Sequence, residues 1–315
     1  MSVAVPSASE RQRERRRSGG QGTKQRVGQW ARRAPLMPAL VFMIIVTQLP
    51  MVATLVISFM DWNAYYPDQR GFTGIDNYRR VLSNVNTVQA ILVTIILTVA
   101  VVLISLVLGL VIALLLDRKF RGRGVVRTLM IAPFLIVPVA AALIWKHALY
   151  NPDYGLFNGV LTWILGDNAP QPDWISSFPL GAIIAALVWQ WTPFMMLIIL
   201  AGLQSKPLDV LEAARIDGAS PWQIFTHMTL PHLRRYLELS VLLGAVYIVQ
   251  NFDHVFTITS GGLGTANLPY DIYQNFYVAH DYGVASAEGV VVVVGTILIA
   301  TFALRTVSTL LKEES

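Results

Sequence analysis

Polar and aromatic side chains interrupt several long apolar stretches of this sequence, where polar groups are costly unless they face a protein interior or a watered cavity. Amides and carboxylates pair with hydroxyl groups, and the faces of indole rings take up C–H patches, so these residue types suit a polyhydroxylated ligand such as a sugar. Trp189 and Trp191 point about 200° apart on a helix, so one of them is expected to be a packing residue. The candidates for lining a solute pathway are Trp189, Gln190, Gln250, Asn251, Asp253 and Glu288.

Glu288 lies about one helical turn, roughly 6 Å, below the outer end of the last apolar stretch. At this depth the carboxylate could simply reach water. The alternative is that it contacts the solute or pairs with a basic group of a partner protein. Both interpretations stay open from the sequence.

Residues that would support bond chemistry are not found in a usable pattern. The sequence contains no cysteine and no G-x-x-x-x-G-K-S/T phosphate loop, and its nearest glycine cluster, Gly19–Lys24, has the wrong spacing. The five histidines show no paired metal-ligand spacing apart from His227 and His232, which are five residues apart across Pro231 and are expected to face the loop without a metal. We therefore expect no metal site, no bound cofactor and no ATP hydrolysis by this chain itself.

Composition identifies a membrane protein. Of 315 residues, 54% are hydrophobic and only 14% are charged, which is far too apolar for an ordinary soluble domain. The net charge of +5 arises from the first 33 residues, which hold nine Lys or Arg against two Glu. We interpret residues 1–33 as a disordered basic tail that holds its end of the chain in the cytoplasm, rather than as a nucleic-acid-binding arm or a cleaved signal peptide.

Residues 34–315 are predicted to be all-α and to cross the membrane six times. A span needs about 20 apolar residues, and six segments meet this requirement. They are Leu36 to Phe59, Gln89 to Leu116, Val125 to Leu149, Pro179 to Leu203, Leu237 to Ile258 and Val284 to Leu304. Pro133, Pro138 and Pro193 are expected to kink their helices, either around a pathway or as ordinary bends of membrane helices.

Loop charges predict the orientation of these spans. The loop at 117–127 carries five Lys or Arg, whereas the loops at 151–178 and 260–283 carry acids and no Lys or Arg. The positive-inside rule then places both termini and the loop at 204–235 in the cytoplasm.

The 204–235 loop contains the segment Glu212 to Pro231, whose local chemistry predicts two short helices joined by a bend. Pro207 and Asp209 suit the first turn of a helix that ends near Ile216. Gly218 follows, where a left-handed backbone is expected. Ser220, Pro221 and Gln223 then form a capping-box pattern that begins a second helix.

The segment contains Glu212-Ala213-Ala214, Asp217-Gly218-Ala219 and Leu230-Pro231. With these residues it resembles the EAA signature of the permeases of ABC importers, in the form typical of carbohydrate-type members. The resemblance covers roughly Pro38 to Leu304. The chain is similar to the first of the two permeases in such importers. Met228 and Leu263 depart from it, standing where the family usually has isoleucine and proline. The resemblance is supported by Phe72 to Tyr78, Asn251-Phe252-Asp253 and Thr259 to Gly262.

The resemblance implies partners and residue roles. The chain would form a heterodimer with a second permease in a bacterial inner or plasma membrane. Two ATPase subunits on the cytoplasmic side would bind ATP and Mg²⁺, and an extracytoplasmic solute-binding protein would act on the other side. Its loop would be the coupling helix, with Glu212 contacting the ATPase, Ala213 and Ala214 packing closely, and Asp217-Gly218 forming the bend. A carbohydrate would pass by alternating access, although the particular sugar or polyol is not specified.

Two other classes of membrane protein would require different sequence features. A secondary transporter driven by an ion gradient is expected to have ionisable groups near the bilayer middle and usually an internal repeat, and neither is evident. An intramembrane enzyme would require a catalytic constellation within the spans, for which Asp253 and Glu288 form the only candidate pair.

Overall fold

The structure is a computed structural model that describes residues 34–166, 168–206 and 208–310. The predicted basic tail lies outside these residues, as do Asp167 and Pro207. The chain divides into two units, residues 1–56 and 57–315, which are described separately.

The described part of the first unit is a short 3₁₀ turn, Ala34–Leu36, and helix α2, Met37–Ile57. No side chain of α2 is buried, and the helix is apolar on all sides. The hydroxyl of Thr47 donates to the carbonyl oxygen of Met43 at 2.7 Å, and that of Thr54 to Pro50 at 3.0 Å. The helix thus satisfies its own hydroxyl groups, as a helix facing hydrocarbon must.

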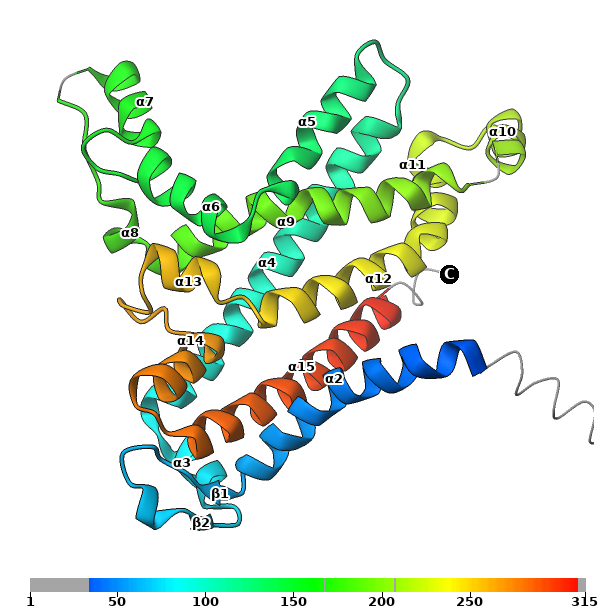
Figure 1. The fold of residues 1–315 in the computed structure, drawn as a ribbon. Helices are drawn as coiled ribbons and strands as arrows, with labels where there is room; N and C mark the ends of the chain where they lie inside the picture. The colour runs from blue at the N-terminus through cyan, green and yellow to red at the C-terminus, as the bar shows by residue number, and fades with distance from the viewer. Residues whose placement is uncertain (1–33, 167, 207, 311–315) are drawn as a thin grey trace, which may run out of the picture. The chain divides into compact units, whose positions relative to one another are not determined.

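The second unit is built of helices and one short β-hairpin, whose antiparallel strands β1 (Met60–Asp61) and β2 (Gly71–Phe72) pair Met60 with Phe72 and Asp61 with Gly71. Its helices are α3 (Asp76–Ser83), α4 (Val85–Asp117), α5 (Arg123–Leu135), α6 (Pro138–Leu143), α7 (Leu156–Leu165), α8 (Trp174–Ser177), α9 (Pro179–Gln204), α10 (Leu208–Ile216), α11 (Pro221–Ile224), α12 (Leu230–Val249), α13 (Asp253–Ile258), α14 (Leu268–Tyr273) and α15 (Tyr282–Leu310), with π-helical turns at Ile144–Leu149, Phe225–Thr229 and Gln274–Val278 (Figure 1).

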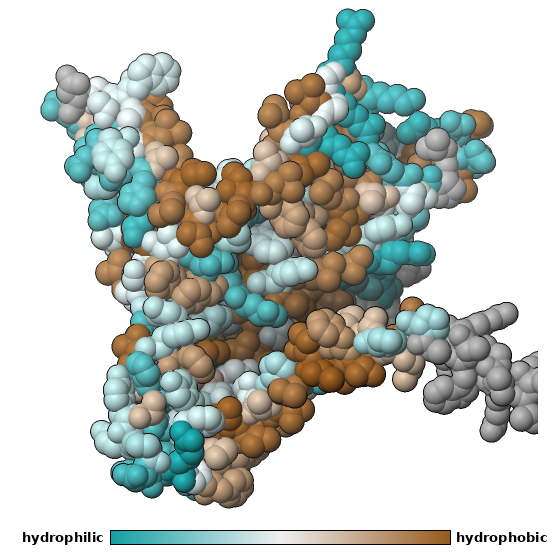
Figure 2. Space-filling model, viewed as in Figure 1, coloured by the Kyte–Doolittle hydropathy of each residue, from teal (hydrophilic) through white to brown (hydrophobic). Residues whose placement is uncertain are grey.

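The core lies where α4, α9 and α12 pack against one another. Ile183, Leu187 and Met195 of α9 are fully buried there. Gly109 of α4 lets the two backbones approach closely, since a Cβ at this position would lie 2.9 Å from the backbone nitrogen of Met196. Outside this core, hydrophobic side chains cover much of the helical surface and hydrophilic ones gather at the connecting segments (Figure 2).

Among the described residues, four helices are long and apolar enough to cross a membrane by themselves: α2, α4, α9 and α15. A fifth span is possible if α5 and the helical segment Pro138–Leu149 count as one broken span. The predicted count of six spans is therefore not confirmed.

The predicted span from Val125 to Leu149 is broken into two helical halves that meet at 97°. Ile136 and Val137 are extended between them, with ψ of 135° and 133°. A residue before proline is driven away from helical geometry, so Pro138 ends α5 and begins α6. The expected kink is a sharp turn of the chain.

The predicted span from Leu237 to Ile258 is also interrupted. Helix α12 begins earlier, at Leu230, and ends at Val249, and α13 starts at Asp253. The first three turns of α12 hold Arg234, Arg235 and Glu238, which lower the apolar character of this helix. The residues between α12 and α13, 250–252, include two of the predicted pathway residues.

Candidate functional site

The loop that carries the predicted coupling residues has the expected two-helix geometry. Gly218 adopts a left-handed backbone with φ of 85°. The amide of Gly218 donates to the carbonyl of Arg215 at 3.2 Å, and that of Ala219 to Ala214 at 3.0 Å, which is the Schellman pattern of a helix C-terminus. The capping box is confirmed as well, because Ser220 and Gln223 exchange bonds of 3.3 and 2.8 Å.

This hinged pair of helices, α10 and α11, presents its predicted contact residues to the outside. Glu212, Ala213, Asp217 and Gly218 are exposed, while Ala214 is half-buried. Two large apolar side chains are exposed beside them, Ile216 at 86% and Trp222 at 70%. Large apolar groups at a protruding bend, rimmed by charged residues, are typical of a surface that contacts another protein.

The start of this loop is held by groups that the sequence did not single out. The hydroxyl of Ser205 lies 3.1 Å from Nε2 of His232 and 2.8 Å from the hydroxyl of Tyr236, both on α12. Lys206 lies 3.9 Å from the carboxylate of Asp117 at the end of α4. Burial lowers the pKa of Lys206, partly offset by Asp117. The bend is thereby connected to the ends of α9, α12 and α4.

An aromatic cluster is formed by side chains of α5, α9 and α12. Trp191 stacks on Tyr247, with ring centroids 5.3 Å apart, and Phe134 and Phe194 pack against Trp191 at 5.6 and 5.7 Å. Tyr247 is 54% exposed, so part of its ring is available to a ligand. We did not identify Tyr247 from the sequence, although it lies three residues before Gln250 and so shares its helix face.

Gln250, Asn251 and Asp253 lie together at the interruption between α12 and α13. Gln250 is exposed, and the other two are half-buried. Asn267 donates its side-chain amide to the carbonyl oxygen of Asn251 at 2.6 Å, which satisfies the backbone at this break. The buried Oδ1 of Asn251 has no protein donor among the described residues. Amide and carboxylate groups of this kind can pair with hydroxyl groups.

Gln190 and Trp189 occupy different surroundings from this site. Gln190 is 4% exposed and donates its amide to the carbonyl of Ile136 at 2.9 Å, at the break between α5 and α6. Trp189 packs against Trp145, with centroids 5.8 Å apart. As expected, Trp189 and Trp191 face different neighbours.

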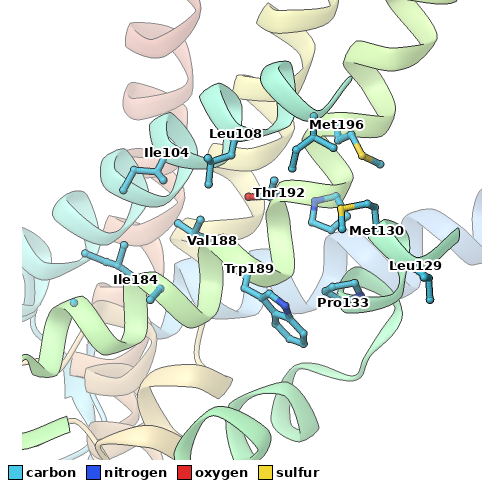
Figure 3. A pocket seen from close by; sticks show the side chains of 14 residues that line it. Ile104, Leu108, Leu129, Met130, Pro133, Ile184, Val188, Trp189, Thr192 and Met196 are labelled. Carbon is cyan, nitrogen blue, oxygen red and sulfur yellow. The ribbon is translucent and has the colours of Figure 1, made fainter. Parts of the chain in front are cut away.

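Trp189 also lines an apolar groove of about 540 Å³ between α4, α5 and α9 (Figure 3). Aliphatic side chains, two methionines and the ring of Pro133 make up most of its wall, and Thr192 is its only hydroxyl-bearing lining residue. Such a wall offers few partners to a sugar, so we do not place the solute there.

Glu288 does not reach water, which corrects one of the two interpretations drawn from the sequence. Its side chain is 0% exposed, at the second turn of α15. Asn275 donates its amide to Oε1 of Glu288 at 2.7 Å. Asp253 sits half-buried at the start of α13.

Comparison with known proteins identifies the class. Residues 105–311 match the family of binding-protein-dependent transport system inner membrane components. The chain is 35% identical to the trehalose/maltose transport system permease protein MalF of Thermococcus litoralis, covering 80% of this chain and 85% of that protein. It is 34% identical to the trehalose transport system permease protein SugA of Mycobacterium tuberculosis, covering 81% of each.

Its fold is that of solved ABC importers. A crystal structure of a bacterial ABC transporter involved in the import of the acidic polysaccharide alginate aligns with a TM-score of 0.78 at 21% identity, over 92% of this chain and 99% of that one. The family match and the relatives above 30% identity define the class, a helical, multi-pass membrane permease subunit of an ABC transporter. The chain belongs to the family of binding-protein-dependent transport system inner membrane components.

Proposed function

We propose that this chain is one of two permease subunits of an ATP-driven importer of a small sugar or polyol in a bacterial cell membrane. It crosses the membrane six times, with both termini and the 204–235 loop in the cytoplasm. The observation that carries the proposal is the hinged pair α10 and α11, which presents exposed Ile216 and Trp222 beside Glu212 on a left-handed glycine bend.

The bend would dock into a cleft of an ATPase subunit, which binds ATP and Mg²⁺. Ser205 and Lys206 connect the start of α10 to α12 and α4, so a movement imposed on the bend is passed to the helices of the core. Closing of two ATPase subunits would then switch the pathway between inward and outward access. A solute-binding protein would deliver the sugar at the outer face.

The solute would bind at the aromatic and amide groups around Tyr247. A sugar ring stacks on the exposed face of Tyr247, supported by Trp191, while Gln250, Asn251 and Asp253 pair with its hydroxyl groups. The trehalose and maltose systems named for its relatives support a sugar as the solute.

The test is to extract the tagged full-length chain from its native membrane in mild detergent, identify the co-purifying proteins, and measure ATP hydrolysis with trehalose or maltose. Recovery of a second permease and an ATPase, with hydrolysis stimulated by sugar and binding protein, is the expected result. Uptake that persists without ATP, by a chain recovered alone, would support an ion-gradient-driven transporter instead.

A further inference from the structure

Glu288 is a fully buried acid with only part of its hydrogen-bonding capacity used. Asn275, in the π-helical turn after α14, donates to Oε1 at 2.7 Å. The other oxygen, Oε2, is buried and has no hydrogen-bond donor among the described residues. A buried carboxylate left in this state is costly, so a missing donor or cation is expected there.

A second acid from another helix faces Glu288. The side chain of Asp271, on α14, lies beside the carboxyl of Glu288, and the Oδ2 atom of Asp271 is likewise buried without a donor. The hydroxyl of Thr87, at the start of α4, also lies near this carboxyl but makes no hydrogen bond of standard geometry with Oε2. Within the described residues, none of the ion pairs involves either acid, so no Lys, Arg or His neutralises the two charges.

One proton resolves both deficits at once. When one carboxyl is protonated, its O–H donates to the other, which replaces like-charge repulsion by a hydrogen bond and leaves a single negative charge stabilised by Asn275. A metal ion is less suited, because no third His, Cys, Asp or Glu joins the pair in the described chain, and Asn275 offers its N–H rather than its carbonyl.

We propose that Asp271 and Glu288 share one proton, and that this protonated pair fastens the segment 268–278 to α15. The same segment is attached to α4 through the amide of Leu268, which donates to the hydroxyl of Thr94 at 2.9 Å. Just before it, Asn267 supports the backbone of Asn251. Loss of the proton would place two adjacent negative charges at this junction and loosen the segment that borders the break at 250–252.

The experiment uses infrared spectroscopy of the full-length chain in lipid nanodiscs, because a protonated carboxylic acid has a carbonyl band well separated from that of a carboxylate. Spectra are compared for the natural chain, Glu288→Gln and Asp271→Asn, with Asp153→Asn, an exposed loop acid, as the matched control. Both test variants keep the size of the side chain and supply an N–H donor, so they are expected to fold.

At neutral pH, the natural chain and Asp153→Asn should show the protonated-acid band, shifted in ²H₂O, and either test variant should lose it. Absence of the band from the natural chain, or its persistence in both variants, would overturn the proposal. Thermal unfolding without and with Na⁺, Mg²⁺ or Ca²⁺ tests a metal instead: a shift that both variants abolish would also overturn the shared proton. Neither measurement depends on transport, so the outcome is distinct from that of the proposed function.

Discussion

Gln190 donates its side-chain amide to the carbonyl oxygen of Ile136, 54 residues earlier in the chain, across 2.9 Å. Ile136 lies in the extended link before Pro138, where the backbone leaves α5 and its carbonyl has no partner in a following helical turn. The bond therefore connects the middle of α9 to the 97° break and makes that break tolerable in an apolar environment.

Replacing Gln190 with Leu should destabilise the protein by about 1 kcal/mol, since hydrogen bonds between membrane helices contribute on this scale. The readout is thermal unfolding of the purified chain in one detergent. Gln204→Leu, at the exposed end of the same helix, is the control and should change stability by less than about 0.5 kcal/mol. Equal stability of the two variants would mean that the bond to Ile136 does not support the break.

Gly109→Ala tests the close approach of α4 and α9. The added Cβ would lie 2.9 Å from the backbone nitrogen of Met196 and 3.0 Å from Cβ of Met195, so the helices must separate. The free energy of unfolding should fall by about 1–3 kcal/mol, as for other overpacked cores. Gly295→Ala, on α15, is the control, because its added Cβ would meet no atom within 4 Å, and it should not lower stability. Thermal unfolding of the two variants under the same conditions is the measurement.

Tyr247→Ala should weaken sugar binding at least about tenfold, or about 1.4 kcal/mol, because the stacking face is removed. Tyr247→Phe retains that face and should bind almost normally. Tyr277→Ala removes an exposed ring from another aromatic cluster, beside Tyr273 and Phe276, and is the control. Direct binding measurements on the assembled transporter give the answer, and equal weakening by both alanine variants would argue against a site at Tyr247.

Asp173, in the loop between α7 and α8, caps α8 in a way that should depend on pH. Its carboxylate accepts bonds from the hydroxyl of Ser176 at 2.6 Å and from the backbone amides of Ile175 and Ser176 at 3.1 Å. The hydroxyl of Ser176, followed by its amide, lowers the pKa of Asp173. The cap therefore contributes fully to the stability of α8 at pH values above the usual aspartate pKa near 4. This contribution is lost as the pH falls through the lowered pKa that Asp173 has in the folded protein.

Asp173→Asn should keep most of the cap, since asparagine is a good N-cap, but remove its dependence on pH. Asp173→Ala should cost about 1 kcal/mol locally at neutral pH. Hydrogen exchange of the amides of residues 175–178, corrected for intrinsic rates at each pH, measures both effects. The same acid dependence in Asp173→Asn as in the natural chain would assign it to another group.

Much of the helical framework could be predicted from residue types alone. Long apolar runs located α2, α4, α9 and α15, because each must be long enough to cross a bilayer. Local capping chemistry located the bend at Gly218 and the start of α11 after Ser220. These features could be predicted because the residues that determine them are neighbours in the sequence.

Features that depend on distant partners could not be predicted in this way. Pro138 signals a disturbance, but whether a helix kinks or turns through 97° depends on a donor such as Gln190 being available to the freed carbonyl. The surroundings of Glu288 depend on Asp271 and Asn275, which lie in a connecting segment without clear periodicity. The role that we propose for Tyr247 depends on its stacking against Trp191, which belongs to another helix and is 56 residues away in the sequence.

Gly218→Val is the sharpest test of the bend between α10 and α11. A Cβ at this position would meet no atom within 4 Å, so the substitution adds no crowding within the chain and acts through the backbone, whose φ of 85° disfavours a β-branched residue by about 1–3 kcal/mol. Asparagine tolerates this conformation, so Gly218→Asn is the matched control.

We expect Gly218→Val to insert into the membrane in normal amounts but to lose sugar-stimulated ATP hydrolysis in the assembled transporter, while Gly218→Asn keeps most of it. Full stimulation in Gly218→Val would show that the left-handed bend is not needed for coupling, and equal loss in both variants would point to a requirement for the small size of glycine against the ATPase.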